Sequence, residues 1–417
     1  MDGACDRRTF LRSAAASAAA LSVPALAHAR ALGSNERIAI GFIGSGSRVV
    51  EAHMPELHKH DKAMNCELTA FADPWRYRRE QAAGLAKQWY GRDPRTFTGY
   101  QDLLALGDVD AVLIASPDHL HAIHLEAAAR AKKDIYVEKP LCKDMEGLRR
   151  AVDAVKAAGV VCQVGTQLRS FPSFTGCREV WKSGVLGKVA RIEQNRNADR
   201  PYWYYRLDPD KAPPADVAWK EFLGPLPERP YSPVQFTAWY GYREFSDGPV
   251  PGLASHFLDL VHYITGAQFP ASAVCQGGVF TFKDEHAFTC PDHVEATWVY
   301  PEGFLVHYST VFGSAHGSTF KMIGDRATLD MLNWNKPFLT SEGAFKKGPV
   351  QGTQPVAPVE RPDHWLDWLQ CIRSRRQPNA PIEAGYQHAV AAIMAVRAMD
   401  TGKRQVYDPA TREVREG

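Results

Sequence analysis

Several features that mark specialised protein classes are scarce in this 417-residue sequence. It has only 8 cysteines, which are widely scattered and form no CxxC pair. Cys5 also lies in a segment that we expect to be removed, so a disulfide framework is not expected. An excess of one charge sign is lacking, because the formal net charge is +2 and no block of basic residues occurs. The sequence therefore shows no footprint of a nucleic-acid partner.

Long apolar runs and internal repeats are missing as well. Beyond residue 29, no segment approaches the roughly 18 consecutive apolar residues of a membrane-spanning helix, so we expect no stable membrane insertion of the mature chain. The sequence is 45% hydrophobic and 23% charged, which excludes a disordered or collagen-like chain. At about 150 residues per domain, its length predicts roughly two to three domains.

The first 29 residues have the pattern of a twin-arginine signal peptide. Arg7 and Arg8 lie in the motif of residues 6–12, an apolar run follows over 14–26, and Ala27-His28-Ala29 offers a small-x-small cleavage pattern. We therefore predict cleavage after Ala29, the twin-arginine export machinery as a partner and a periplasmic location. An uncleaved anchor or an ordinary helix is the alternative. This route carries folded proteins, which suits an enzyme that captures a cofactor before export.

Residues 36–165 alternate short, unbroken apolar runs with longer helical periods. This β-α-β pattern predicts a parallel sheet covered on both faces, as in a Rossmann dinucleotide-binding domain. The predicted strands are 37–43, 67–72, 110–115, 135–137 and 160–164.

The amino-acid composition changes after residue 165, where aromatic residues and prolines become frequent. We predict an α+β domain over 166–403 with an open, mainly antiparallel sheet, and a tail over 404–417. The predicted strands are 274–282, 294–300, 304–311 and 318–323, the predicted helices are 363–373 and 383–399, and 336–362 is predicted as a loop.

A glycine-rich turn follows the first predicted strand. Its backbone amides and the next helix N-terminus could bind a pyrophosphate through Gly44, Ser45, Gly46, Ser47 and Arg48. Asp73 ends the second strand, where a carboxylate accepts both ribose hydroxyls and favours NAD over NADP. Nearby arginines, Arg76 among them, weaken this preference because one could pair with a 2′-phosphate. A glycine turn that binds no nucleotide is the alternative.

Polar residues also end the next two parallel strands. Ser116, Pro117, His119 and His121 follow one strand, and Glu138-Lys139-Pro140 ends the other. Ligands bind at such carboxyl ends in parallel sheets, so these residues are candidates for cofactor contact. A lysine in a desolvated site can exchange protons, which makes Lys139 a candidate catalytic residue rather than a surface lysine.

These motifs, together with the segment 252–259, resemble the glucose–fructose oxidoreductase, inositol dehydrogenase and rhizopine-catabolism (Gfo/Idh/MocA) family. The resemblance covers residues 37 to 403 and is strongest up to about residue 170. It implies that Lys139 is the catalytic lysine, that Glu138 contacts the nicotinamide ribose and that His121 lines the cofactor pocket. It also implies that Gln167 and Arg169 lie at the nicotinamide and substrate end.

The segment 252–259 is similar to the family's active-site helix. His256 could exchange a proton with a sugar hydroxyl, and Asp259 at i+3 could orient it, or the two could form a plain core pair. Many family members carry an aspartate where this sequence has Gly252. Either Lys139 and His256 suffice, or another group fills the gap; the candidates are Tyr204, Tyr242 and Asp247.

Two aromatic clusters at 202–206 and 239–243 suit either a carbohydrate site or core packing. From them we select Tyr204, Trp239 and Arg243, with Arg169 and His256, as candidate substrate contacts. Residues 290–293 with His286 have metal-ligand types, but the signal is too weak to predict a metal.

The sequence thus predicts an exported NAD-dependent oxidoreductase that acts on a sugar, polyol or glycoside. Free NAD is scarce in the periplasm, so we expect a tightly bound cofactor. The resemblance implies a homo-oligomer and two mechanisms that need no free NAD: a sugar-to-sugar redox couple, or NAD-assisted glycoside hydrolysis through transient oxidation, elimination and return of the hydride. A non-catalytic sugar- or dinucleotide-binding protein is the alternative outside enzymes.

Overall fold

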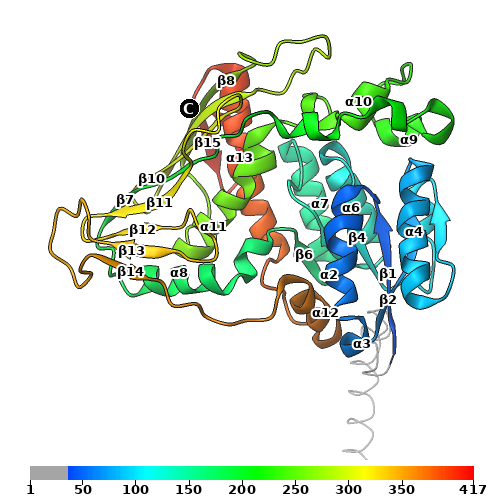
Figure 1. Cartoon of the computed structure of the whole chain (residues 1–417), viewed down its shortest axis with the longest axis horizontal. Helices are drawn as coiled ribbons and strands as arrows, with labels where there is room; N and C mark the ends of the chain where they lie inside the picture. The colour runs from blue at the N-terminus through cyan, green and yellow to red at the C-terminus, as the bar shows by residue number, and fades with distance from the viewer. Residues whose placement is uncertain (1–35) are drawn as a thin grey trace, which may run out of the picture.

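The structure, a computed structural model, describes residues 36–417, so the predicted signal peptide at 1–29 lies outside the described residues. Two β-sheets, each with its own helices, make up the molecule (Figure 1). In the described part of the chain, no helix has the length and apolarity needed to cross a membrane.

The first sheet has six parallel strands in the order β3-β2-β1-β4-β5-β6. Helices α2 (Met54–His58) and α4 (Arg76–Tyr90) cover one face, and α6 (His121–Arg130) and α7 (Met145–Ala158) cover the other. Its strands are β1 (Ile38–Ile43), β2 (Cys66–Ala72), β3 (Arg95–Phe97), β4 (Ala111–Ile114), β5 (Asp134–Val137) and β6 (Cys162–Val164). The predicted Rossmann fold is confirmed, and the burial of every residue of β1, β4 and β5 explains their unbroken apolar runs.

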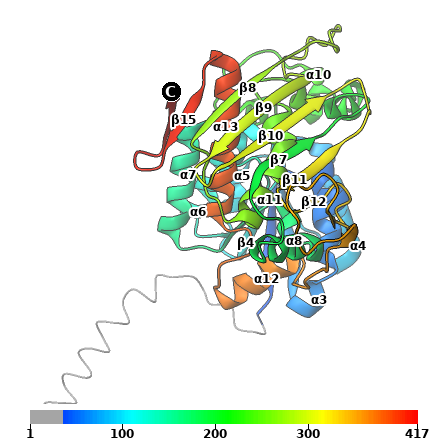
Figure 2. The same cartoon turned by 90° about the vertical axis from the view of Figure 1, so that its left-hand side faces the viewer.

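The second sheet has ten strands in the order β14-β13-β12-β11-β7-β10-β9-β8-β15-β16. Neighbouring strands run antiparallel except β7 with β10, so the predicted open, mainly antiparallel sheet is confirmed. Helices α8 (Pro172–Lys182), α11 (Ser255–Thr265) and α13 (Ile382–Thr401) pack on one face of this sheet. Figure 2 shows the sheet from its other face, with the strands in front of these helices. The strands are β7 (Val189–Asn195), β8 (Ser272–Gly278), β9 (His293–Tyr300), β10 (Phe304–Val311), β11 (Thr319–Gly324), β12 (Thr328–Asp330), β13 (Phe338–Thr340), β14 (Thr353–Pro355), β15 (Gln405–Asp408) and β16 (Glu413–Glu416).

Two segments form strands that the sequence did not predict. The presumed tail at 404–417 forms β15 and β16, which close one edge of the second sheet and bury Tyr407 and Val414. The presumed loop at 336–362 contributes β13 and β14 at the other edge. Each of these strands is only 3 or 4 residues long, too short for an alternating pattern to stand out.

Helix α12 (His364–Ser374) belongs to the second half of the sequence but packs against the first sheet, in the cluster that also holds residues of α2 and α4. Trp368, Leu369 and Ile372 are buried in the same cluster as Ile38 and Phe42 of β1. The predicted boundary at residue 165 therefore separates the two sheets but not the two cores.

Residues 201–247 form an irregular segment, here called the strap, which runs from the second sheet across the end of the first (Figure 1). It includes α9 (Trp219–Leu223) and α10 (Pro233–Thr237), and its aromatic side chains form a separate buried cluster. The backbone of Ala218 donates to Pro74 O at 2.9 Å, and the rings of Trp75 and Phe236 meet edge to face at 5.4 Å. The strap is thus fixed to the loop that follows β2.

Candidate active site

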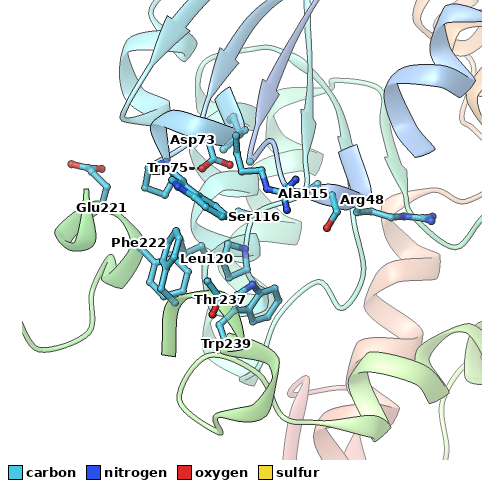
Figure 3. Close-up of a pocket in the computed structure, with 18 of the residues that line it drawn as sticks. Arg48, Asp73, Trp75, Ala115, Ser116, Leu120, Glu221, Phe222, Thr237 and Trp239 are labelled. Carbon is cyan, nitrogen blue, oxygen red and sulfur yellow. Dashed lines mark hydrogen bonds between the residues drawn. The ribbon is translucent and has the colours of Figure 1, made fainter. Parts of the chain in front are cut away.

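A cavity of about 410 Å³ lies between the strap and the carboxyl ends of the first sheet's strands. The glycine-rich turn and the ends of β2 and β4 form one wall, and the strap forms the other (Figure 3). Ligands of open parallel sheets bind at this edge, as the sequence predicted.

The glycine-rich turn approaches β4 closely. Gly44 has φ +88°, and a Cβ there would lie 2.7 Å from backbone atoms of Ala115 and Ser116, so only glycine fits. A Cβ on Gly46 would meet no protein atom within 4 Å, which leaves its backbone open to a ligand. Gly44, Gly46, Ser47 and Arg48 line the cavity as predicted. These features fit the pyrophosphate of a dinucleotide.

Ser45 and Asp73 support the turn from behind. The Ser45 amide donates to Asp73 Oδ2 at 2.6 Å, and the Trp75 amide donates to Asp73 Oδ1 at 2.8 Å. Asp73 also lines the cavity. Burial raises the pKa of its carboxyl, and the two amide hydrogen bonds oppose that rise. Each carboxylate oxygen keeps a second acceptor site for a ribose hydroxyl.

Arg76, predicted to contact the cofactor, is paired instead with Asp216 of the strap and does not line the cavity. The cavity is lined by Arg78, whose guanidinium stacks over Trp75 at 5.2 Å. The rotation of helix α4 about its axis decides which arginine faces the cavity, and the sequence alone did not predict that rotation.

Glu138 ends β5 in a network of charges. It accepts from the Lys139 amide at 3.1 Å and pairs with Arg48 at 3.5 Å and His53 at 3.0 Å. Burial opposes ionisation of Glu138, but the His53 hydrogen bond and the Arg48 charge lower its pKa overall. Glu138 is thus held as a carboxylate.

His53 was not predicted as a site residue. Trp365 Nε1 donates to His53 Nδ1 at 3.2 Å, which leaves the imidazole proton on Nε2, where it faces Glu138. Burial lowers the pKa of His53, so the ring is neutral. Its partners lie far away in the sequence, and no local pattern marks it.

Gln167, which the resemblance placed at the nicotinamide and substrate end, contacts the same network. Its amide oxygen accepts from Arg48 Nη2 at 2.5 Å, and its nitrogen donates to Gly165 O at 2.5 Å. Gln167 thereby fixes Arg48 beside Glu138.

Lys139 lies where the two domains meet. Its Nζ donates to Gly252 O at 2.7 Å. Burial lowers the pKa of the Lys139 amine, while the charges of Glu138 and Asp118 oppose the change. An amine with a lowered pKa can exchange protons nearer to neutral pH.

His256 lies beside Lys139. Burial, followed by the Lys139 charge, lowers its pKa well below 6.5, so the ring is neutral. Its Nδ1 is buried and hydrogen-bonds to none of residues 36–417. No hydrogen bond joins His256 to Asp259, but the charge of Asp259 partly opposes the fall in the pKa of His256.

Asp259 points instead into the second domain. It accepts from Arg169 Nε at 2.8 and 2.7 Å and faces His388 at 3.8 Å, and Arg169 stacks on Tyr263 at 5.2 Å. The structure thus joins Asp259 and Arg169 in a buried ion pair, and their catalytic and substrate roles stay predictions.

The three candidates for the place of the missing aspartate all bond elsewhere. Tyr204 donates to Asp284, and Tyr242 donates to His286 O at 2.8 Å. Asp247 lies 3.5 Å from Lys143 Nζ and 3.4 Å from Arg243 Nε. The predicted substrate contact of Tyr204 stays a prediction.

The residues after β4 divide between the cavity and the strap. Ser116 and Pro117 line the cavity, and Ser116 Oγ contacts His124 Nδ1 at 2.9 Å. His119 was predicted to bind the cofactor, but its Nε2 donates to Phe222 O at 2.9 Å and holds the strap. His121 is buried, with Nδ1 donating to Pro140 O at 2.6 Å.

The two remaining candidates from the aromatic clusters, Trp239 and Arg243, differ in whether they line the cavity. Trp239 lines the cavity, stacked on Tyr240 with centroids 3.6 Å apart (Figure 3). Arg243 donates to Asp400 at 2.9 Å and does not line the cavity, and its substrate contact stays a prediction.

The weak metal motif is a loop anchor. Asp292 accepts from the amides of Phe280, Thr281 and Phe282 at 2.7–2.9 Å and pairs with His293 at 2.6 Å. Among residues 36–417, no group of three metal-ligating side chains comes together.

Similarity to known proteins agrees with this geometry. Residues 38–166 match the NAD-binding Rossmann fold of the Gfo/Idh/MocA oxidoreductase family, and residues 228–407 match that family's C-terminal alpha/beta domain. The scyllo-inositol 2-dehydrogenase (NAD(+)) of Bacillus subtilis is 32% identical over 152 residues, which span 36% of this chain and 39% of that enzyme. The alignment thus covers less than half of this relative.

Solved structures match over a longer stretch. A levoglucosan dehydrogenase in complex with NADH has a TM-score of 0.67 at 16% identity, and 88% of this chain and 98% of that chain are covered. The aldose-aldose oxidoreductase of Caulobacter crescentus, complexed with glycerol, has a TM-score of 0.65 at 17% identity over 88% and 99%. These likenesses concern the fold. With both domains of the family matched and a cavity that fits NAD, the chain belongs to the Gfo/Idh/MocA family of NAD-binding oxidoreductases.

Proposed function

We propose that the protein transfers a hydride between NAD and a hydroxyl-bearing carbon of a sugar or polyol, with Lys139 as the proton-exchanging group. The observation that carries this proposal is the buried Lys139 amine at the end of β5, with a lowered pKa and neutral His256 beside it. Inositol and levoglucosan dehydrogenases among the similar proteins support the substrate class.

When NAD is bound, its nicotinamide is the group that accepts the hydride. During oxidation, the substrate carbon loses its hydrogen with both electrons. The Lys139 amine, once it has lost its own proton, takes the hydroxyl proton, so that a carbonyl remains. Glu138, held ionised by His53 and Arg48, is an acceptor suited to the nicotinamide ribose. His256 stays neutral and can relay the proton onward.

A tightly held cofactor is part of this proposal. The strap covers the adenosine end of the cavity and is fixed there by the Ala218–Pro74 and His119–Phe222 hydrogen bonds. A dinucleotide bound at this end would be held in part by contacts with the strap. Such retention suits a periplasmic enzyme, which works without a pool of free NAD.

The proposal is tested on protein purified without added cofactor. Denaturation should release a dinucleotide close to one per chain. The native protein is then incubated with scyllo-inositol, levoglucosan, D-glucose and aryl glycosides. Reduced nicotinamide absorbance with a carbonyl product supports the oxidoreductase, aglycone release without an oxidised product supports NAD-assisted hydrolysis, and inertness toward all of them supports a binding protein.

Export is tested separately. In cells that make the full chain, replacement of Arg7 and Arg8 by lysine should leave the protein in the cytoplasm at precursor size. The unchanged chain should appear in the periplasm, shortened after Ala29. Equal distribution of the two chains would overturn the proposed location.

We also propose a homo-oligomer that uses the open face of the second sheet. Val299 and Leu305 are exposed there, directly opposite each other on β9 and β10, and Ile323 is exposed on β11. Leu305→Lys should reduce the mass measured by light scattering after size exclusion. Glu302→Lys, in the exposed turn after β9, is the matched control.

A further inference from the structure

Tyr202 carries a buried hydroxyl that the mechanism above does not use. Its ring meets Trp203, Tyr240 and Phe312 edge to face at centroid distances of 5.2, 5.4 and 6.1 Å. The hydroxyl oxygen is shielded from solvent and hydrogen-bonds to none of the residues that the structure describes. A buried hydroxyl without a partner is destabilising unless a ligand or water completes it.

The hydroxyl lies at Gly252, which also contacts the catalytic lysine. A Cβ placed on Gly252 would lie 2.5 Å from Tyr202 Oη and 3.3 Å from its Cζ. Tyr202 Oη therefore fills the space that a side chain at position 252 would occupy. The Gly252 carbonyl accepts from Lys139 Nζ at 2.7 Å. The phenol and the amine thus border the same residue.

The local backbone favours this arrangement. Gly252 lies in a π-helical turn, Val250–Ala254, which leads into α11 and His256. Such turns are frequent at functional sites. On the other side, Tyr240 packs against the Tyr202 ring and lines the cavity. Tyr202 therefore links the strap to the reaction end of the site.

We propose that Tyr202 is a substrate-contacting catalytic residue, whose hydroxyl donates a hydrogen bond to the oxygen on the reacting carbon. The inference rests on the proposed function and deepens it. No proton leaves the phenol: the substrate proton passes to Lys139, and the phenol stabilises the negative charge that develops on oxygen as that proton departs. Burial raises the pKa of Tyr202 well above 10, which suits a neutral donor.

The test compares Tyr202→Phe with the unchanged enzyme, using whichever of scyllo-inositol, levoglucosan and D-glucose reduces the bound NAD fastest. Loss of one hydrogen bond to developing charge lowers kcat by roughly 100-fold. Bound NAD per chain and Tm should not fall, because the lost hydroxyl has no protein partner. The rise of kcat with pH should keep its shape, since Lys139 remains the proton acceptor.

Tyr242→Phe is the matched control. Its hydroxyl donates to His286 O at 2.8 Å, so this variant loses a protein hydrogen bond in the strap but should keep kcat within about 3-fold. Equilibrium binding of the same sugar to the reduced enzyme supplies a readout independent of turnover. It should weaken in Tyr202→Phe and not in Tyr242→Phe.

Each outcome has a distinct meaning. If the unchanged enzyme reduces NAD but Tyr202→Phe does so equally well, the role of Tyr202 is overturned and the proposed function stands. If the pH dependence disappears in Tyr202→Phe, the phenol is the base and the inference is wrong in its assignment of roles. If no sugar reduces NAD in the unchanged enzyme, the proposed function fails and this inference with it.

Discussion

The two ends of the cavity region are built from different chemistry. The cavity at the proposed adenosine end is lined by strap aromatics such as Phe222, Phe236 and Trp239. The reaction end gathers buried titratable groups, namely Lys139, His256 and Tyr202, each with a shifted pKa. Burial of apolar surface contributes to cofactor affinity whatever the protonation state of nearby groups. Proton transfer, in contrast, requires groups whose pKa values give them a defined protonation state. Retention of the cofactor and transfer of the proton should therefore respond to different substitutions.

The largest effect is expected at the reaction end. Lys139→Ala removes the proton acceptor and should lower kcat by about 10³-fold or more, while bound NAD per chain stays unchanged. Steady-state kinetics and dinucleotide content after gel filtration measure the two properties. Lys156→Ala, which removes an exposed amine paired with Glu383, is the control. A loss of NAD in Lys139→Ala would contradict the separation of the two ends.

The reverse pattern is expected at the other end. Asp73→Ala leaves the amides of Ser45 and Trp75 without their acceptor and removes the ribose contact. NAD affinity should fall by roughly 100-fold, since buried charged hydrogen bonds are costly to break, while kcat at saturating NAD stays within about 3-fold. Titration calorimetry measures the affinity. Asp93→Ala, at an exposed pair with Lys87, should change neither quantity.

Acid should weaken the strap through His119. Burial lowers the pKa of His119 and of His364 to about 4, against 6.5 when unfolded. The unfolded chain therefore binds protons that the folded protein does not, so stability is highest above pH 6.5 and is lost as the pH falls toward about 4. Urea unfolding at pH 7 and 4.5 measures this loss. His119→Gln should reduce the pH dependence; an unchanged slope would show that His119 does not carry it.

The smallest effect is expected at the half-exposed Arg76–Asp216 pair between α4 and the strap. Such pairs contribute about 0–1 kcal/mol, so Asp216→Ala should speed NAD release by no more than about 5-fold. Stopped-flow fluorescence of bound NADH measures the rate, and high salt should remove the difference. A larger effect would mean that this one pair, rather than the aromatic cluster, holds the strap closed.

The sequence predicted the first domain well because its chemistry is local. Fully buried strands such as β1 and β4 require unbroken apolar runs, and Gly44 is required by its positive φ and close approach to β4. The first strand and the glycine-rich turn can therefore be recognised within one short stretch of sequence.

The rest of the site depends on contacts between distant residues. Tyr202 meets Gly252, and Trp365 meets His53 across 312 positions, and no sequence pattern records either contact. Residue type alone also does not reveal the partners of Tyr204 and Arg243, whose side chains suit a sugar but pair with Asp284 and Asp400. The direction in which a side chain points depends on its tertiary contacts.

The return of α12 to the first sheet has a consequence for how the chain folds. Trp368 and Ile372 complete the apolar cluster around Ile38, and Arg373 donates to Met64 O at 3.2 Å. A ribosome makes these residues after nearly nine-tenths of the chain, so the nucleotide domain cannot finish its core while synthesis continues. Fragments that end near residue 166 would expose this face and aggregate. The enzyme becomes competent to hold its cofactor only as a nearly complete polypeptide.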